Sequence, residues 1–167
     1  VKFEGEGFFQ VEKGSRFEVE SANGTTTVLG TSFNIFSRDE QYEVTCFTGK
    51  IQVGTHKNSQ QTILSASEQA KIYRGKIART ITRNSEQVIA WRENMFSFTA
   101  EPIQSVIKEI ERQYNVQIQL EIQDELNYTG NFPRNQPVEE VLALVCQPMQ
   151  LTFEKQPDKG FIVRKIE

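Results

Sequence analysis

Two hydrophobic periods divide the chain near residue 90. Up to about residue 81, apolar residues recur at every second position in short runs, for example at Phe17 and Val19. Turn signals separate these runs. Among them, Asn23-Gly24 favours a tight type I′ hairpin, because both central residues of that turn need a positive φ. The pattern predicts an all-β domain over residues 1–88, built of short antiparallel strands as a sandwich or as stacked β structure.

Apolar residues in the second half recur with the period of a helix. One stripe follows Pro102, which suits a first helical turn because its missing N–H would have no partner there. A second stripe follows Pro137 and ends near Cys146. The first stripe consists of Ile103, Val106, Ile107, Ile110 and Tyr114. The second consists of Val138, Val141, Leu142 and Val145. Each stripe predicts an amphipathic helix that packs against a partner surface.

The two helical segments belong to an internal repeat. The offset that carries Pro102 to Pro137 also carries every apolar residue of the first stripe to another apolar residue. It continues into the next strand, where Val116 maps to Leu151. We therefore predict an α+β domain over residues 96–167 made of duplicated β-α-β units.

Strands of alternating polarity complete this second domain. Val116, Ile118, Leu120 and Ile122 alternate with polar residues, so that one side of the strand faces a core and the other faces water. Strands are predicted at 96–100, 116–122, 128–132, 150–155 and 160–166, with a turn at Asp158-Lys159-Gly160 and a linker at 89–95. Two right-handed crossovers would then place both helices on one face of a small mixed sheet.

Charge and cysteine content limit the classes of partner. The 167 residues include 19 basic and 22 acidic side chains, for a formal net charge of −3, without a basic stripe. Binding to nucleic acid depends on neutralising phosphates, so we expect no nucleic-acid partner. Cys46 and Cys146 fall in different predicted domains, each within an apolar element, and are expected to be core residues without a disulfide.

The chain begins with Val1 and contains no apolar stretch near the ~20 residues that a membrane span needs. We expect it to be a fragment from which any leader or membrane anchor has been removed.

Residues capable of chemistry do not form a recognisable constellation. His56 is the single histidine, whereas a metal site needs several donors and a catalytic imidazole needs a nucleophile. The paired carboxylates Asp39-Glu40 and Asp124-Glu125 fall in predicted turns, where acidic residues are common. Gly5-Glu6-Gly7 lacks the third glycine and the helix of a dinucleotide site. We predict no catalytic residue, no metal and no cofactor, and therefore no enzyme.

Four segments of the first half, taken in order, resemble the FecR family of sigma-factor regulators. They span residues 5–11, 17–19, 28–35 and 48–53, and the most specific reads Leu29-Gly30-Thr31-Ser32-Phe33-Asn34. Trp91, Phe96-Ser97-Phe98 and Pro102-Ile103 then resemble the junction at which Bacteroidetes-type members add a C-terminal module of the secretin and TonB short N-terminal type. The chain departs from the pattern in starting inside the β domain, without the earliest strands, and in carrying Thr48 where an acidic residue is common.

The resemblance implies a signalling protein that spans the cell envelope. In that family a cytoplasmic N-terminal segment holds an extracytoplasmic-function sigma factor, a single span anchors the protein in the inner membrane, and the periplasmic part is similar to this chain. The C-terminal module would receive its signal from the signalling domain of a TonB-dependent outer-membrane transporter. The resemblance thus implies a periplasmic location, with the membrane anchor and the sigma-factor-binding segment outside this fragment.

The residues themselves also favour protein docking, because the open edge of a small sheet can accept a partner strand. The candidate interface residues are Gln117, Gln119, Glu121, Tyr128, Phe132 and Arg164. For Tyr128 and Phe132 a core role is an equal interpretation. The alternative function is a carbohydrate- or peptidoglycan-binding β module with an accessory α+β domain, which would need a concave aromatic patch on the first half.

Overall fold

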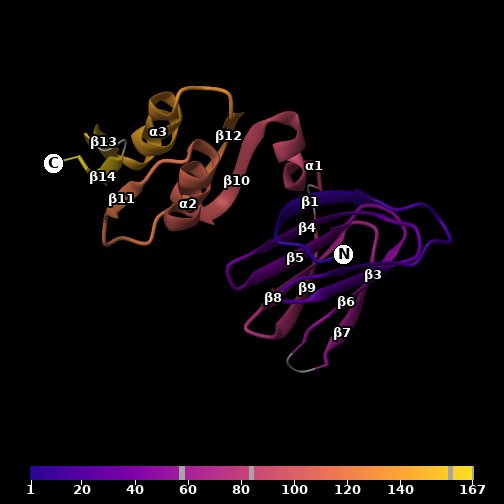
Figure 1. Cartoon of the computed structure of the whole chain (residues 1–167). Helices are drawn as coiled ribbons and strands as arrows, with labels where there is room; N and C mark the ends of the chain where they lie inside the picture. Colours follow the sequence, from indigo (N-terminus) through magenta and orange to yellow (C-terminus); the bar gives the residue numbers. More distant parts are fainter. Residues whose placement is uncertain (57–58, 83–84, 158–159, 167) are drawn as a thin grey trace. The chain divides into compact units, whose positions relative to one another are not determined.

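The computed structural model describes residues 1–56, 59–82, 85–157 and 160–166. These residues form two compact units, Val1–Ile89 and Ala90–Glu167 (Figure 1). Part of the predicted turn at Asp158-Lys159-Gly160 lies outside the described residues. Among those residues, no helix is both long enough and apolar enough to cross a membrane.

The first unit is an antiparallel β sandwich. Its strands are β1 (Gly5–Gln10), β2 (Phe17–Glu20), β3 (Thr25–Val28), β4 (Ser32–Arg38), β5 (Gln41–Cys46), β6 (Lys50–Gly54), β7 (Gln61–Ser65), β8 (Glu68–Tyr73) and β9 (Lys76–Ile81), and α1 (Ser85–Val88) follows. They form a five-stranded sheet in the order β1-β4-β5-β8-β9 and a four-stranded sheet in the order β2-β3-β6-β7. The predicted all-β class is confirmed.

Both sheets contribute side chains to one core. Alternation places Val19, Val28, Ile51, Val53 and Leu64 of the smaller sheet against Phe33, Ile35, Tyr42, Val44, Cys46, Ala70 and Ile72 of the larger one. A buried hydrogen bond of 2.7 Å joins the hydroxyls of Thr26 and Tyr42 inside this core. Burial raises the pKa of Tyr42 to about 12.

The β2–β3 connection differs from its prediction. The loop comprises residues 21–24, and neither Asn23 nor Gly24 is among the described residues with positive φ, so it is not a type I′ hairpin. Glycine is required at position 24 for a steric reason instead, because a Cβ there would lie 2.9 Å from side-chain carbons of Tyr42 and Ile72. Asn23 donates a hydrogen bond of 2.8 Å to the Asp39 carbonyl, which ties this loop to the β4–β5 turn.

The second unit is an α+β domain. Its elements are η1 (Ala90–Glu93), β10 (Met95–Pro102), α2 (Ile103–Tyr114), β11 (Ile118–Glu121), β12 (Asn127–Pro133), α3 (Val138–Cys146), η2 (Gln147–Met149), β13 (Leu151–Lys155) and β14 (Phe161–Lys165). The predicted α+β class is confirmed, and the short helix η1 occupies residues 90–93 of the segment expected to be a linker, 89–95.

The strands of this unit form two sheets where one was expected. A mixed sheet has the order β11-β14-β13, with β11 parallel and β13 antiparallel to β14. Strands β10 and β12 form a separate antiparallel pair. Helix α2 therefore connects two sheets, as does α3, and neither makes the predicted crossover between parallel neighbours. The β10–β12 register explains the separation, since it pairs Phe96 with Phe132 and puts both rings into the core.

The internal repeat is visible in the backbone. Pro102 and Pro137 precede α2 and α3 with nearly the same φ and ψ, −52° and 133° against −54° and 145°. After the helices, Asn115 and Gln150 both adopt the left-handed conformation, with φ of 51° and 56°. The helices bury their stripes in one core with side chains from both sheets, including Phe96, Tyr128, Phe132, Leu151, Phe161 and Val163.

Candidate protein-docking surfaces

The mixed sheet of the second unit presents one polar face, which we call the β11 face. It consists of Gln119 and Glu121 on β11, Ile162 and Arg164 on β14, and Thr152 and Glu154 on β13. Their neighbours in each strand point the other way, so that Ile118, Leu151, Phe161 and Val163 are buried. The strand alternation thus separates a core side from an exposed side.

Hydrogen bonds organise the β11 face. Gln119 donates a hydrogen bond of 2.7 Å to the Glu121 carboxylate. Arg164 is in register with Glu121 and pairs with Glu154 at 2.8 Å. Because these charges are exposed, they hold each other weakly and can exchange partners with a docking protein. Strands β11 and β13 also lie at the two edges of this sheet.

Of the six residues that we predicted at an interface, four are exposed and two are buried. Gln119, Glu121 and Arg164 share the β11 face, and exposed Gln117 lies just before β11, where its carbonyl accepts a 2.8 Å hydrogen bond from the Phe161 N–H. Thr152 and Glu154 also belong to this face but were not predicted as interface residues. Their alternation with the apolar Leu151 and Phe153 indicates in the sequence that they point away from the core.

The surface role suggested for Tyr128 and Phe132 is wrong, because only 5% and 6% of these residues is exposed. Both lie on the core side of β12, where the two rings pack edge to face with centroids 6.3 Å apart. The Tyr128 hydroxyl donates a hydrogen bond of 3.2 Å to the Leu144 carbonyl on α3. The core interpretation is therefore the correct one for both residues.

Arg134 connects the first residues of the second unit, Asn94 to Phe96, to the end of β12. Its guanidinium lies 4.7 Å from the centre of the Phe96 ring and donates a 2.9 Å hydrogen bond to the Met95 carbonyl. Its backbone N–H donates to the Asn94 carbonyl at 2.8 Å. Glu109 on α2 contributes a carboxylate 3.9 Å away, and only 14% of the Arg134 side chain is exposed. Arg134 could not be identified from the sequence, since a lone arginine after a strand gives no periodic signal.

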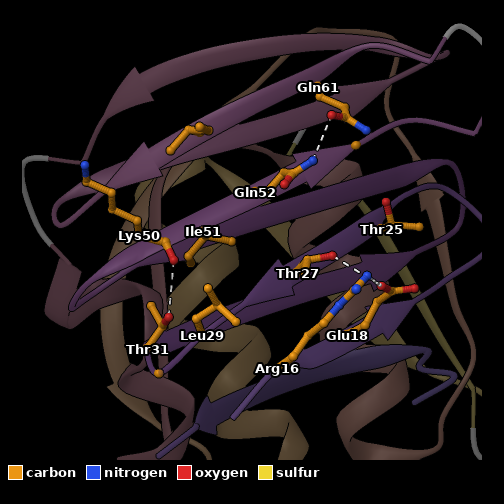
Figure 2. Close-up of a pocket in the computed structure, with 13 residues that line it drawn as sticks. Arg16, Glu18, Thr25, Thr27, Leu29, Thr31, Lys50, Ile51, Gln52 and Gln61 are labelled. Atoms are coloured by element: carbon orange, nitrogen blue, oxygen red, sulfur yellow. Dashed lines mark hydrogen bonds and ion pairs between the residues drawn. The ribbon is translucent and has the colours of Figure 1, made fainter. Parts of the chain in front are cut away.

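A shallow depression of about 810 Å³ lies on the outer face of the four-stranded sheet in the first unit (Figure 2). We call it the β3–β6 depression. It is lined by Arg16, Glu18, Thr25, Thr27, Leu29, Gly30, Thr31, Lys50, Ile51, Gln52, Gly54, Gln61 and Ile63, among which there is no aromatic residue. Leu29 and Ile63 are 66% and 58% exposed, so two aliphatic side chains of this depression face solvent.

The described residues hold no group of three or more histidine, cysteine or carboxylate side chains that could bind a metal ion. His56 contacts the Ser21 carbonyl through Nε2 at 2.8 Å. The thiols of Cys46 and Cys146 are buried in the separate cores of the two units, and burial raises the pKa of each to about 11. Such thiols are predominantly protonated at neutral pH and are poor nucleophiles.

Glu68 links three strands of the sandwich. Its carboxylate accepts a 2.7 Å hydrogen bond from the Ser65 N–H at the end of β7 and a 3.1 Å hydrogen bond from Nε of Arg79 on β9. The hydrogen bond from Arg79, followed by that from Ser65, lowers the pKa of Glu68 below its usual value.

We expect a pH dependence from Glu68. Because its pKa is lower in the folded state, ionised Glu68 stabilises the sandwich above the pKa of the unfolded chain, about 4.3. This contribution is lost as the pH falls through the lower, folded-state pKa. Urea unfolding of Glu68→Gln at a series of pH values should show a deficit relative to the parent chain at pH 6 that shrinks as the pH is lowered toward 3. An equal deficit at both ends of the range would contradict the assignment.

Comparisons with known proteins agree with the geometry. A family model described as FecR protein matches residues 2–52, and a second, described as FecR, C-terminal, matches residues 95–163. No curated protein matches the chain significantly.

Two crystal structures of a candidate anti-sigma factor from Parabacteroides distasonis ATCC 8503 are similar over nearly the whole chain. For the first, the TM-score is 0.87 at 28% identity, covering 99% of this chain and 80% of the other. For the second, the TM-score is 0.86 at 28% identity, covering 99% and 79%. With one FecR model matching each unit in chain order, and with this structural relative, the chain belongs to the FecR family.

Proposed function

We propose that this chain is the periplasmic signalling portion of a membrane-anchored anti-sigma factor, and that it acts by binding proteins and not by catalysis. The observation that carries the proposal is the ordered match of two FecR models to the two units, together with the similarity to a candidate anti-sigma factor. An extracytoplasmic-function sigma factor would bind a cytoplasmic segment outside residues 1–167. The inner-membrane anchor would lie between that segment and this chain.

The proposed signal comes from a TonB-dependent outer-membrane transporter. Its periplasmic signalling domain would dock on the β11 face of the second unit. This face combines exposed polar groups with the edge strand β11, and an edge strand can bind a partner through main-chain hydrogen bonds. The Ile118 N–H at this edge is already bonded to the Glu111 carboxylate at 2.7 Å, so a partner strand would pair along the rest of β11. The first unit would then support or relay the signal.

A binding experiment tests this docking surface. The signalling domain of a TonB-dependent transporter from the same organism would be titrated into the full chain and followed by calorimetry. Replacing both Glu121 and Arg164 with alanine should weaken binding about tenfold, because each removes a polar contact worth about 0.5–1 kcal/mol. The matched control replaces Glu43 and Lys71 with alanine, since this exposed pair joins β5 and β8 at 2.8 Å in the other unit. Equal affinity for all three proteins would reject the β11 face.

The alternative, a glycan-binding β module, has less support. It requires a concave aromatic patch on the first unit, and the lining of the β3–β6 depression includes no aromatic side chain. Aromatic rings are the usual platform for the apolar faces of sugars. We therefore keep the signalling proposal as the conclusion.

A further inference from the structure

We propose that the β3–β6 depression binds an extended peptide segment with an acidic residue and aliphatic side chains, supplied by a partner protein. This site lies on the first unit and is separate from the β11 face. It does not depend on the transporter docking proposed above, because it is argued only from the chemistry of its own lining.

The strand register arranges the lining in rows across the sheet. One row runs from Glu18 through Thr27 and Gln52 to Ile63. In the next row, Gly54 lies between Thr25 and Gln61 and is itself buried, because the side chains of both neighbours cover it. Gln52 and Gln61 form an exposed pair of amides beside this row, as Figure 2 shows.

The amide pair indicates what the β3–β6 depression can recognise. Gln52 donates a hydrogen bond of 2.7 Å to Oε1 of Gln61 (Figure 2). This orientation leaves Oε1 of Gln52 as an acceptor and Nε2 of Gln61 as a donor, both facing solvent on exposed side chains. One donor beside one acceptor is complementary to the N–H and C=O of a single residue in an extended peptide, because these two groups point to the same side of the chain. A peptide backbone therefore fits this pair better than a charged or wholly apolar ligand.

Two exposed aliphatic side chains lie beside the amide pair, away from the Gln61–Gly54 row: Ile63 is in register with Gln52, and Leu29 follows Val28, which is in register with Ile51. Leu29 follows β3 and Ile63 lies on β7, two strands away. Strand spacings place their Cα atoms about 12 Å apart, close to the separation of residues i and i+4 in an extended peptide. Two apolar side chains of one extended segment can thus cover both. Burying them would remove two of the larger exposed apolar groups of the chain from water.

Charge favours an acidic residue in that segment. Arg16 and Lys50 are the cations of the lining, and Glu18 is its single anion. The Arg16 guanidinium lies 3.2 Å from the Glu18 carboxylate, which also accepts a 3.4 Å hydrogen bond from Thr27. Among the described residues, no carboxylate lies within ion-pairing distance of the Lys50 ammonium, and in Figure 2 the Lys50 side chain points away from Leu29 toward the edge of the drawn residues. The lining therefore has a surplus of one positive charge within a chain of net charge −3.

A defined probe tests the proposal on the full chain. An amidated, acetylated peptide of sequence Ser-Val-Thr-Glu-Thr-Val-Ser, whose glutamate shares one face with both valines when the peptide is extended, would be titrated into ¹⁵N-labelled protein. An analogue carrying lysine at the acidic position is its counterpart. We expect amide shifts at Thr27, Gln52 and Ile63 with the acidic peptide and binding at least fivefold weaker for the lysine peptide. Lys50→Glu should reduce affinity for the acidic peptide by about fivefold, and the double variant Leu29→Thr, Ile63→Thr should abolish detectable binding.

Matched variants separate the site from general surface effects. Lys76→Glu replaces a positive charge on β9 with a negative one. Tyr73→Thr removes a large side chain on β8 that is 50% exposed. Both should leave peptide affinity unchanged. Every variant alters an exposed side chain, so a well-dispersed amide spectrum for each verifies folding before titration.

Three results would overturn the proposal. The first is a lack of shifts at these amides with millimolar acidic peptide. The second is shifts at the same amides with chitotetraose or soluble peptidoglycan fragments but not with peptide, which would assign the depression to glycan. The third is a set of shifts that depends on protein concentration without any ligand, which would assign the face to a second copy of the chain.

Discussion

Replacing Arg134 with methionine is expected to lower the free energy of unfolding of the second unit by about 2–4 kcal/mol, although no other residue of the chain changes. The variant retains an unbranched stem but loses the cation beside the Phe96 ring and the 2.9 Å hydrogen bond to the Met95 carbonyl. It also leaves the Glu109 carboxylate without its nearly buried partner.

Amide hydrogen exchange measures this effect in each unit separately, which matters because a two-unit chain need not unfold in one step. Exchange at the buried Phe96 and Ile110 amides should accelerate, while exchange at Ile35 in the sandwich should not. Arg164→Met is the matched control, since that side chain is about half exposed and pairs with Glu154 at the surface. A loss of equal size in both variants would show that Arg134 acts only through its charge.

Replacing Gly130 with alanine is expected to destabilise the second unit by about 1–3 kcal/mol, the usual cost of overpacking a well-filled core. A Cβ on Gly130 would overlap the phenol ring and hydroxyl of Tyr128, which lies two residues earlier on the same face of β12. The ring cannot turn away freely, because it is buried and its hydroxyl is bonded to the Leu144 carbonyl.

A double-mutant cycle checks that the Tyr128 phenol causes the loss. Tyr128→Phe removes the hydroxyl that lies nearest to the added methyl group, so Gly130→Ala should cost less in that background. Gly54→Ala provides a control at another strand glycine, where the closest contact is the movable Thr25 hydroxyl at 2.9 Å. Equal costs for Gly130→Ala with and without the Tyr128 hydroxyl would rule out this mechanism.

The repeat and the periodicity of the apolar residues predicted much of the fold. Helix α2 begins after Pro102 and ends near Tyr114 as the stripe requires, because burial of one face dictates a spacing that is readable without coordinates. The same reasoning did not anticipate two sheets in the second unit. Pairing between strands depends on contacts such as Phe96 with Phe132, and alternation within a single strand does not specify its neighbour.

The candidate surfaces were predictable only in part. Alternation along β11 was enough to identify Gln119 and Glu121, but it could not distinguish an exposed aromatic residue from a buried one on β12, so Tyr128 and Phe132 were placed ambiguously. The β3–β6 depression depends on side chains from four strands that are brought together by register. Its amide pair arises because register brings Gln52 of β6 next to Gln61 of β7, a neighbour relation that alternation within either strand does not give.

Each unit carries a single thiol, so that the local opening of each unit can be measured separately in the unmodified protein. Cys46 and Cys146 are shielded in separate cores, so a maleimide can reach either one only when its surrounding unit opens. Labelling followed by peptide mass mapping would give two independent rates from one unmodified protein. A partner that stabilised only one unit would slow the labelling of the cysteine in that unit. The labelling rate of the other cysteine would stay unchanged and would serve as an internal control.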